Sequence, residues 1–237
     1  MEKLWYTQQT DFLSQLNPKD REELLAIGDQ FSCRKNDLIF QAGSPGDSVY
    51  FLSDGRAKIF QLSPTGKEVI LWFCFAGEMF GMAEIYRRER REVYARACCD
   101  TRVVRVNQQD FKNYLTTHVD VAMLTIDLLS CRLRALGDLL LDIASDDVMS
   151  RLIKLLTRLS TRYGIADGDA IRLEIPLTHQ EMADMIGASR QTVSSAISEL
   201  RKQGFLSIEH QHILIHKSEE LFGRCLRQPM TAPSTLM

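Results

Sequence analysis

The sequence predicts an α+β chain in three parts: an N-terminal jelly-roll β-barrel, a long dimerisation helix and a C-terminal winged helix-turn-helix. Three observations predict this fold class. Short runs rich in Val, Ile, Phe and Tyr alternate with glycine-containing turns over residues 30–107. An apolar heptad pattern covers residues 122–143, and two short helices with a glycine between them are indicated within residues 178–203. The expected domains are a sensor barrel at 1–117, the long helix at 118–145 and the winged helix-turn-helix at 146–237.

The bulk composition is that of a globular protein with room for two ordinary domains. Of the 237 residues, 45% are hydrophobic and 25% are charged. The 29 Lys and Arg against 31 Asp and Glu give a net charge of −2, so affinity for nucleic acid requires a local basic surface. The longest apolar run, residues 69–76, is much shorter than the roughly 20 residues that cross a bilayer. We therefore expect a cytoplasmic protein with no membrane partner.

The N-terminal third changes from a helical to a strand-like period. Residues 1–29 have a helical pattern, and Asn17-Pro18 is typical of a helix start. Beyond residue 30, turn signals such as Asp54-Gly55 separate short β-prone runs. Such a succession favours a β-sandwich or a barrel. The expected strands are 38–40, 49–52, 57–62, 68–75, 93–98 and 102–106.

Residues 119–144 return to a helical period with two apolar stripes. One stripe steps by four and three residues over about three heptads, which is the narrow pattern of a coiled-coil seam. Its members are Ala122, Ile126, Leu129, Leu133, Leu136, Leu140 and Ile143. The second stripe, on another face, holds Leu124, Leu128, Cys131, Ala135 and Leu139. We expect one stripe to pack on the barrel and the other to meet a second copy; the alternative is one buried helix in a monomer.

The C-terminal third has the spacing of a helix-turn-helix. A helix at 147–163 and a strand at 171–175 are expected before it. Thr178 and Glu181 form a capping box, and Gly187 suits a left-handed turn before a second helix that begins near Ser189. Counted from His179, apolar residues stand at positions 4, 8, 10, 15 and 18, with Ala at 5 and Gly at 9. This combined spacing is far more specific than any single residue, and a hairpin predicted after residue 203 would be the wing.

The outward face of the second helix has the chemistry of a DNA reader. Arg190 can bond guanine bidentately and Gln191 can bond adenine in the same way. Hydroxyl and basic side chains around them suit phosphate contacts, and the helix start adds backbone donors. The predicted DNA-binding residues are Thr178, His179, Ser189, Arg190, Gln191, Thr192, Ser194, Ser195, Arg201 and Lys202. The alternative is an ordinary helical hairpin with a solvated face.

With these motifs the chain resembles the Crp/Fnr family of bacterial transcription regulators over roughly residues 20–216. The resemblance rests on the segments QAGSPGDSVYFLSDGRAKIF, PTGKEVILWFCFAGEMFG and LTHQEMADMIGASRQTVSSAISELRKQGFLSI. It implies a homodimer that binds a pseudo-palindromic operator and acts on RNA polymerase, with a signal received by a cyclic-nucleotide-binding-like barrel. Members that read a TGA-type core carry Glu and Arg where this chain has Gln191 and Ser195, so the operator sequence stays open.

The barrel departs from the members that bind cyclic AMP. They carry Gly-Glu and Arg-Ser or Arg-Thr in a phosphate-binding cassette, where this chain has Gly81-Met82 and Arg91-Glu92. Arg91 can hold a phosphate, whereas Glu92 would repel one. The effector pocket implied by the resemblance consists of Gly81, Met82, Arg91, Glu92, Arg132 and Leu136. We expect an unidentified effector other than cyclic AMP; the alternative is a cyclic-nucleotide- or haem-dependent member of the family.

No cofactor can be assigned from the sequence. The six cysteines have no zinc-ligand spacing, so no metal site is predicted, and we expect reduced thiols. An Fe–S cluster would need several N-terminal cysteines, and only Cys33 is there. Haem would need an axial ligand, for which Cys74, Cys98 and Met82 are candidates, although a role in core packing is favoured for these residues.

Residues 87–92 form a dense charged turn with four Arg and two Glu, which is either a solvated loop or a binding site for a small anionic effector.

Two other classes of protein are alternatives to a DNA-binding regulator: an enzyme and a kinase subunit. No nucleophile–base pair, phosphate loop or HExxH motif is present, so we do not expect an enzyme. A cyclic-nucleotide-controlled kinase subunit is a further alternative, but such subunits lack a helix-turn-helix.

Overall fold

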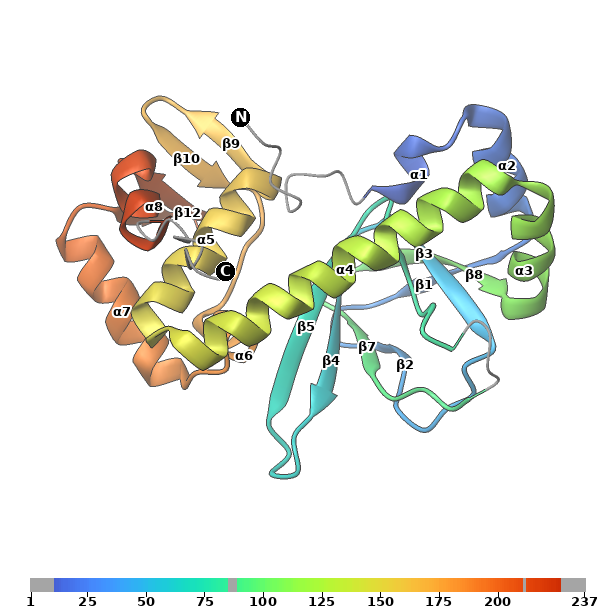
Figure 1. Ribbon diagram of the computed structural model, residues 1–237, viewed down its shortest axis with the longest axis horizontal. Helices are drawn as coiled ribbons and strands as arrows, with labels where there is room; N and C mark the ends of the chain where they lie inside the picture. Colours follow the sequence, from blue (N-terminus) through green and yellow to red (C-terminus); the bar gives the residue numbers. More distant parts are fainter. Residues whose placement is uncertain (1–10, 85–88, 211, 227–237) are drawn as a thin grey trace, which may run out of the picture. The chain divides into compact units, whose positions relative to one another are not determined.

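The computed structural model describes residues 11–84, 89–210 and 212–226, which form two compact units (Figure 1). The first unit extends to Leu136 and the second begins at Gly137. The boundary between them lies within one continuous helix, α4 (Val119–Ser145). No helix among the described residues is long and apolar enough to cross a membrane.

The first unit is built on two antiparallel four-stranded sheets. One sheet has the order β1-β8-β3-β6, with β1 (Asp29–Cys33), β8 (Thr101–Asn107), β3 (Ser48–Asp54) and β6 (Met79–Phe80). The other has the order β2-β7-β4-β5, with β2 (Leu38–Phe40), β7 (Tyr94–Ala97), β4 (Arg56–Leu62) and β5 (Glu68–Phe75). All six strands expected from the sequence are present within one or two residues, and the predicted jelly-roll class is confirmed.

Alternation along β3 produces two cores. Tyr50 and Leu52 point into an apolar cluster between the two sheets, with Phe40, Ile59, Cys74, Phe80, Ala95 and Val103. Val49 and Phe51, on the opposite face of the same strand, pack in a second cluster with residues of the helices. Because both faces of this sheet are covered, β3 is a nearly continuous buried run.

Four helices contribute to the second of these clusters or extend from it. They are α1 (Phe12–Gln15), α2 (Pro18–Ala26), α3 (Gln108–Thr117) and α4. The backbone N of Asp20 donates to Oδ1 of Asn17 at 2.9 Å, which is the predicted start of α2. On α4, Leu128 and Cys131 are buried and Leu124 packs against the cluster, so this part of the second stripe does face the barrel.

Two strands of the first unit have no clear signal in the sequence. β1 is mostly polar and largely exposed, because it is an edge strand whose one partner among the described strands is β8. β6 has two residues, fixed by pairing with Tyr50 and Phe51 across the sheet. Both strands are set by their partners rather than by their own hydrophobic pattern.

The second unit contains a helical core and a small antiparallel sheet. Its helices are α5 (Val148–Tyr163), α6 (His179–Ile186), α7 (Arg190–Lys202) and α8 (Ser218–Leu226). The sheet order is β11-β12-β10-β9, with β9 (Gly164–Asp167), β10 (Ala170–Leu173), β11 (Leu206–Glu209) and β12 (His212–His216). The predicted helix-turn-helix and its hairpin are confirmed. β9 and α8 were not expected, and the strand predicted at 171–175 ends at Leu173.

Candidate nucleic-acid interface

Reciprocal hydrogen bonds fix the start of the first helix of the motif. Oγ1 of Thr178 accepts a bond from the backbone N of Glu181 at 3.1 Å. The Glu181 carboxylate accepts one from the backbone N of Thr178 at 2.8 Å. The predicted capping box is therefore present, and such a cap contributes about 1 kcal/mol to the stability of a helix.

The turn between α6 and α7 depends on one glycine. Gly187 has φ 66° and ψ 38°, a left-handed conformation that side chains with a Cβ adopt at a cost. The backbone N of Ala188 then donates to the Ala183 carbonyl at 2.9 Å. Oγ of Ser189 accepts from the backbone N of Thr192 at 3.1 Å and so begins α7. These bonds set the direction in which α7 leaves the turn.

The polar side of α7 is exposed because its apolar side is fully used in packing. Val193, Ile197 and Leu200 are each at most 2% exposed. Of the ten predicted DNA-binding residues, eight are in the exposed class: Thr178, Ser189, Arg190, Gln191, Thr192, Ser195, Arg201 and Lys202. The three basic side chains among them have no ion-pair partner within the described residues. Their charge is therefore available to an anionic ligand.

The other two predicted residues, His179 and Ser194, are hydrogen-bonded to each other and are not fully exposed. Nδ1 of His179 and Oγ of Ser194 lie 2.8 Å apart, and both residues are half-buried. The sequence placed Ser194 on the outer face, but its hydroxyl links the start of α6 to the middle of α7. Its contribution is therefore to the angle between the two helices as much as to the surface.

A hollow lies where the two helices begin. It has a volume of about 500 Å³ and is lined by Thr178, His179, Gln180 and Arg190. Unpaired backbone N–H groups at helix starts favour an anion, and the Arg190 guanidinium adds a full positive charge. Burial, and then the neighbouring Arg190 and Arg201, lower the pKa of His179 below its ordinary value. The hollow has the chemistry of a phosphate site.

The wing is formed by β11 and β12, which pair antiparallel from Leu206 opposite Ile215 to Glu209 opposite His212. β12 also pairs with β10, so the wing is one edge of a four-stranded sheet. Arg224 of α8 lies over the ring of Phe205 at 4.2 Å, which fixes the chain between α7 and the wing.

In the first unit, two of the six predicted effector-pocket residues meet directly. Nη1 of Arg91 donates to the Gly81 carbonyl at 2.8 Å. The Arg91 side chain is 0% exposed, and its Nη1 also lies 2.6 Å from Oε2 of Glu84. Glu92 is exposed, and its expected repulsion of a bound anion stays a prediction; the carboxylate paired with Arg91 is that of Glu84. Nothing in the sequence signalled this pairing, since Glu84 lies in a loop without periodic structure.

The other four predicted pocket residues do not gather around Arg91. Met82 is 3% exposed and belongs to the apolar cluster beneath the helices. Arg132 donates through Nη2 to the Met79 carbonyl and lies over the ring of Trp72 at 5.1 Å. Leu136 is half-buried on α4. Of the charged turn at 87–92, Arg87 and Arg88 lie outside the described residues.

The candidate haem ligands are buried or half-buried within the first unit. Cys74 is 0% exposed in the cluster between the sheets, and Cys98 is half-buried beside β7. Within the described parts of the chain, no group of three or more His, Cys, Asp or Glu side chains could hold a metal ion. Cys33, Cys74, Cys98, Cys99 and Cys131 form no disulfide within the described residues.

Two family models match the chain. A cyclic nucleotide-binding domain matches residues 30–118, and a Crp-like helix-turn-helix domain matches residues 150–222. The CRP-like cAMP-activated global transcriptional regulator of Mycobacterium tuberculosis is 31% identical over 186 residues, covering 78% of this chain and 83% of that protein. The anaerobic regulatory protein of Bacillus subtilis is 27% identical over 215 residues, covering 90% of each. The chain belongs to the Crp/Fnr family of transcription regulators and carries its DNA-binding helix-turn-helix.

Solved structures agree with this fold. A mutant of CooA from Carboxydothermus hydrogenoformans superposes with a TM-score of 0.75 at 22% identity, covering 86% of this chain and 90% of that one. The c-di-GMP responsive regulator CLP of Xanthomonas campestris gives 0.72 at 19% identity, covering 84% and 99%. The M. tuberculosis regulator is described as cAMP-activated and CLP as c-di-GMP responsive, so membership of the family does not define the effector here.

The buried arginine of the barrel, Arg91, is already paired within the chain. The matched domain implies a ligand phosphate, and Arg91 is the one Lys or Arg within the described residues that is fully buried. Its guanidinium is already bonded to the Glu84 carboxylate and to two backbone carbonyls. A phosphate would need the place that Glu84 holds.

Proposed function

We propose that the chain acts as a homodimer that binds a pseudo-palindromic DNA operator, with α7 of each copy in the major groove. The observation that supports this best is the exposed polar face of α7, which has no acidic residue before Glu199. Arg190 and Gln191, near the start of the helix, are the base-reading side chains. Arg201 and Lys202 at its end, together with the hollow at the starts of α6 and α7, bind phosphates.

The apolar seam on α4 supports the dimer. Within the described chain, five of its seven members are exposed: Ile126 by 55%, Leu129 by 42%, Leu133 by 72%, Leu140 by 69% and Ile143 by 47%. A helix that leaves a heptad stripe uncovered stabilises itself by pairing with the same stripe of a second copy. Two-fold symmetry of the protein then requires a symmetric operator with half-sites about one helical turn apart.

The three parts take separate roles in this proposal. Residues 1–117 form the sensor, residues 118–145 the dimerisation helix and residues 146–237 the DNA-binding domain. A signal received by the barrel changes the orientation of the two reading helices, and the bound dimer acts on RNA polymerase in the cytoplasm. The two family models, which match residues 30–118 and 150–222, support the separation of sensor and reader.

Selection from a pool of random DNA duplexes tests the proposal. The expected result is enrichment of a site with two inverted half-sites, and binding that weakens steeply with salt because both copies neutralise phosphates. Arg190→Glu, which puts a carboxylate on the reading face, abolishes the enrichment.

Arg21→Glu is the matched control, because it makes the same change at an exposed position of α2 in the first unit. Its selected site is expected to equal that of the unmodified protein. An asymmetric consensus, or equal effects of the two substitutions, contradicts the proposal.

A further inference from the structure

The least exposed ion pair within the described residues lies in the first unit and joins Arg91 to Glu84. The side chains are 0% and 6% exposed, and Nη1 of Arg91 lies 2.6 Å from Oε2 of Glu84. Nη1 also donates to the Gly81 carbonyl at 2.8 Å, and Nη2 donates to the Ser48 carbonyl. A buried guanidinium requires a counter-charge, and here the chain itself supplies one.

Packing holds both partners in place. The Arg91 guanidinium lies over the rings of Phe40 at 4.5 Å and Tyr50 at 5.6 Å. A Cβ at Gly46 would come within 2.6 Å of Cβ of Glu84, so only glycine at that position leaves room for this side chain. Nε2 of Gln108 donates to the backbone carbonyl of Glu84. The position of the Glu84 side chain is therefore fixed by its neighbours in the loop as well as by its ion pair with Arg91.

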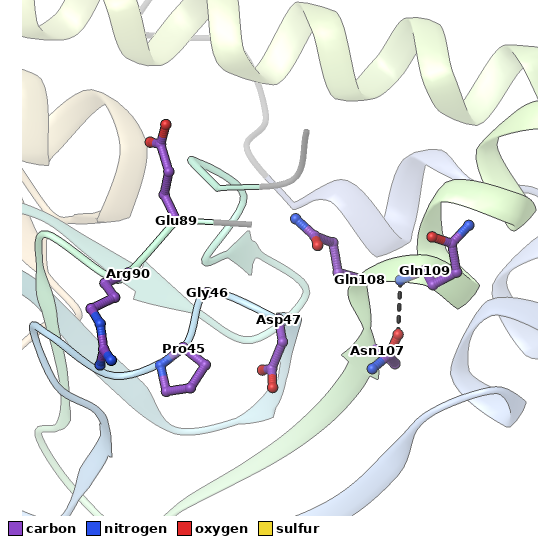
Figure 2. Close-up of a pocket in the computed structure, with 8 residues that line it drawn as sticks. All are labelled: Pro45, Gly46, Asp47, Glu89, Arg90, Asn107, Gln108 and Gln109. Atoms are coloured by element: carbon purple, nitrogen blue, oxygen red, sulfur yellow. Dashed lines mark hydrogen bonds between the residues drawn. The ribbon is translucent and has the colours of Figure 1, made fainter. Parts of the chain in front are cut away.

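The nearby surface also disfavours an external anion. Gly46 and Gln108, the residues that contact Glu84, line a hollow of about 480 Å³ together with Asp47 and Glu89 (Figure 2). Figure 2 shows Arg90, the one basic residue among the described residues of the lining, directed away from Glu89, and its Nη1 donates to the Gly43 carbonyl. Among the described residues, the lining of this hollow presents two carboxylates, and its Arg90 side chain is directed away from Glu89 and bonded to a backbone carbonyl.

We propose that Glu84 is a built-in counter-anion of Arg91, so that the barrel binds no cyclic nucleotide through this arginine and acquires an anion site only when the Glu84 charge is removed. In the unmodified protein an incoming phosphate would have to expel a carboxylate that is already bonded and enclosed. Nε of Arg91 has no acceptor within the described residues, so the guanidinium keeps one donor for an anion once Glu84 is neutral. This inference concerns the barrel alone and does not depend on DNA binding.

The test measures anion binding to the purified full-length protein and its variants. Calorimetry of the unmodified protein with cyclic AMP and cyclic GMP is expected to show no binding with a Kd below about 1 mM. The thermal scans compare all proteins in an Arg190→Ala background, which weakens the phosphate hollow at the starts of α6 and α7. In this background and without a change in the barrel, inorganic phosphate is expected to raise the thermal midpoint no more than chloride at equal ionic strength. Glu84→Gln, which keeps the shape of the side chain, is expected to be stabilised by phosphate with an affinity at least about tenfold higher than that of the protein with an unchanged barrel.

Two controls make the result specific. Glu89→Gln removes a carboxylate of the hollow but leaves the Arg91–Glu84 pair intact. It is expected to leave the effect of phosphate on the thermal midpoint unchanged. Glu84→Gln combined with Arg91→Met removes the buried charge altogether and is expected to lose the response. Binding of a cyclic nucleotide by the unmodified protein overturns the proposal without any variant. A folded Glu84→Gln protein with no gain in phosphate affinity also overturns it.

Discussion

Replacing Leu133 by glutamate is expected to separate the dimer into folded monomers. Leu133 is 72% exposed in the single chain and lies at the centre of the seam on α4. Fully burying a leucine side chain contributes about 1.5–3 kcal/mol, so covering its exposed part contributes about 1–2 kcal/mol in each copy. Both copies lose this contact, and the total of about 2–4 kcal/mol corresponds to a dimer Kd weaker by about 30- to 1000-fold.

Analytical ultracentrifugation over a range of protein concentrations measures that change. The thermal midpoint of the monomer is expected to stay close to its original value, because Leu133 contributes little to packing within one chain. Asp127→Lys is the control: it changes an exposed charge on the same helix, about 100° around the axis from Ile126, and should leave the Kd unchanged. A Leu133→Glu protein that sediments as a dimer with an unchanged Kd refutes the assignment of the seam.

Three further predictions concern the second unit. Arg190→Ala is expected to cost about 1–3 kcal/mol of DNA binding and to relax preference at one base pair per half-site, whereas Lys202→Ala weakens all sequences alike; titrations of single-base operator variants distinguish the two outcomes. The pKa of His179 is lowered from 6.5, so the unfolded chain binds more protons; the unit loses stability as pH falls below 6.5, and His179→Gln removes this part of the dependence in thermal scans. Gly187→Val is expected to destabilise the unit by about 1–2 kcal/mol, because the nearest atom to a Cβ there is 3.8 Å away and only the left-handed backbone is strained. Gly187→Asn should cost less in the same denaturant titration, and an equal loss would indicate a clash rather than strain.

The helix-turn-helix could be predicted in detail because its signals are local. Thr178 and Glu181 are three residues apart, and the bonds that start α7 also join residues three apart. Capping and turn chemistry of this kind depends on the nearest few residues and on little else. The seam on α4 is equally local, since its heptad period is a property of one helix. The heptad pattern predicts where the stripe lies, but its role as a dimer contact is inferred from the exposure of its side chains in the structure.

The short strands and the barrel site could not be predicted in the same way. β1 and β6 exist because β8 and β3 offer them backbone partners, and their own residues are polar or too few to show a period. His179 and Ser194 are 15 residues apart, and their hydrogen bond depends on the angle at which α6 and α7 cross. An alternation or a heptad cannot reveal a contact that arises from the crossing of two elements.

The sequence by itself determined the class of protein, the reading helix and the apolar seam, because each follows from residue types at short, regular spacings. Only the tertiary structure decided the chemistry of the barrel. Arg91 meets Glu84, seven positions earlier in the same connection between β6 and β7, and the Ser48 carbonyl, 43 positions earlier in the chain. A buried charge pairs with whichever partner the fold brings to it, so the identity of its counter-ion is fixed by the path of the chain in the fold and not by the adjacent residue Glu92.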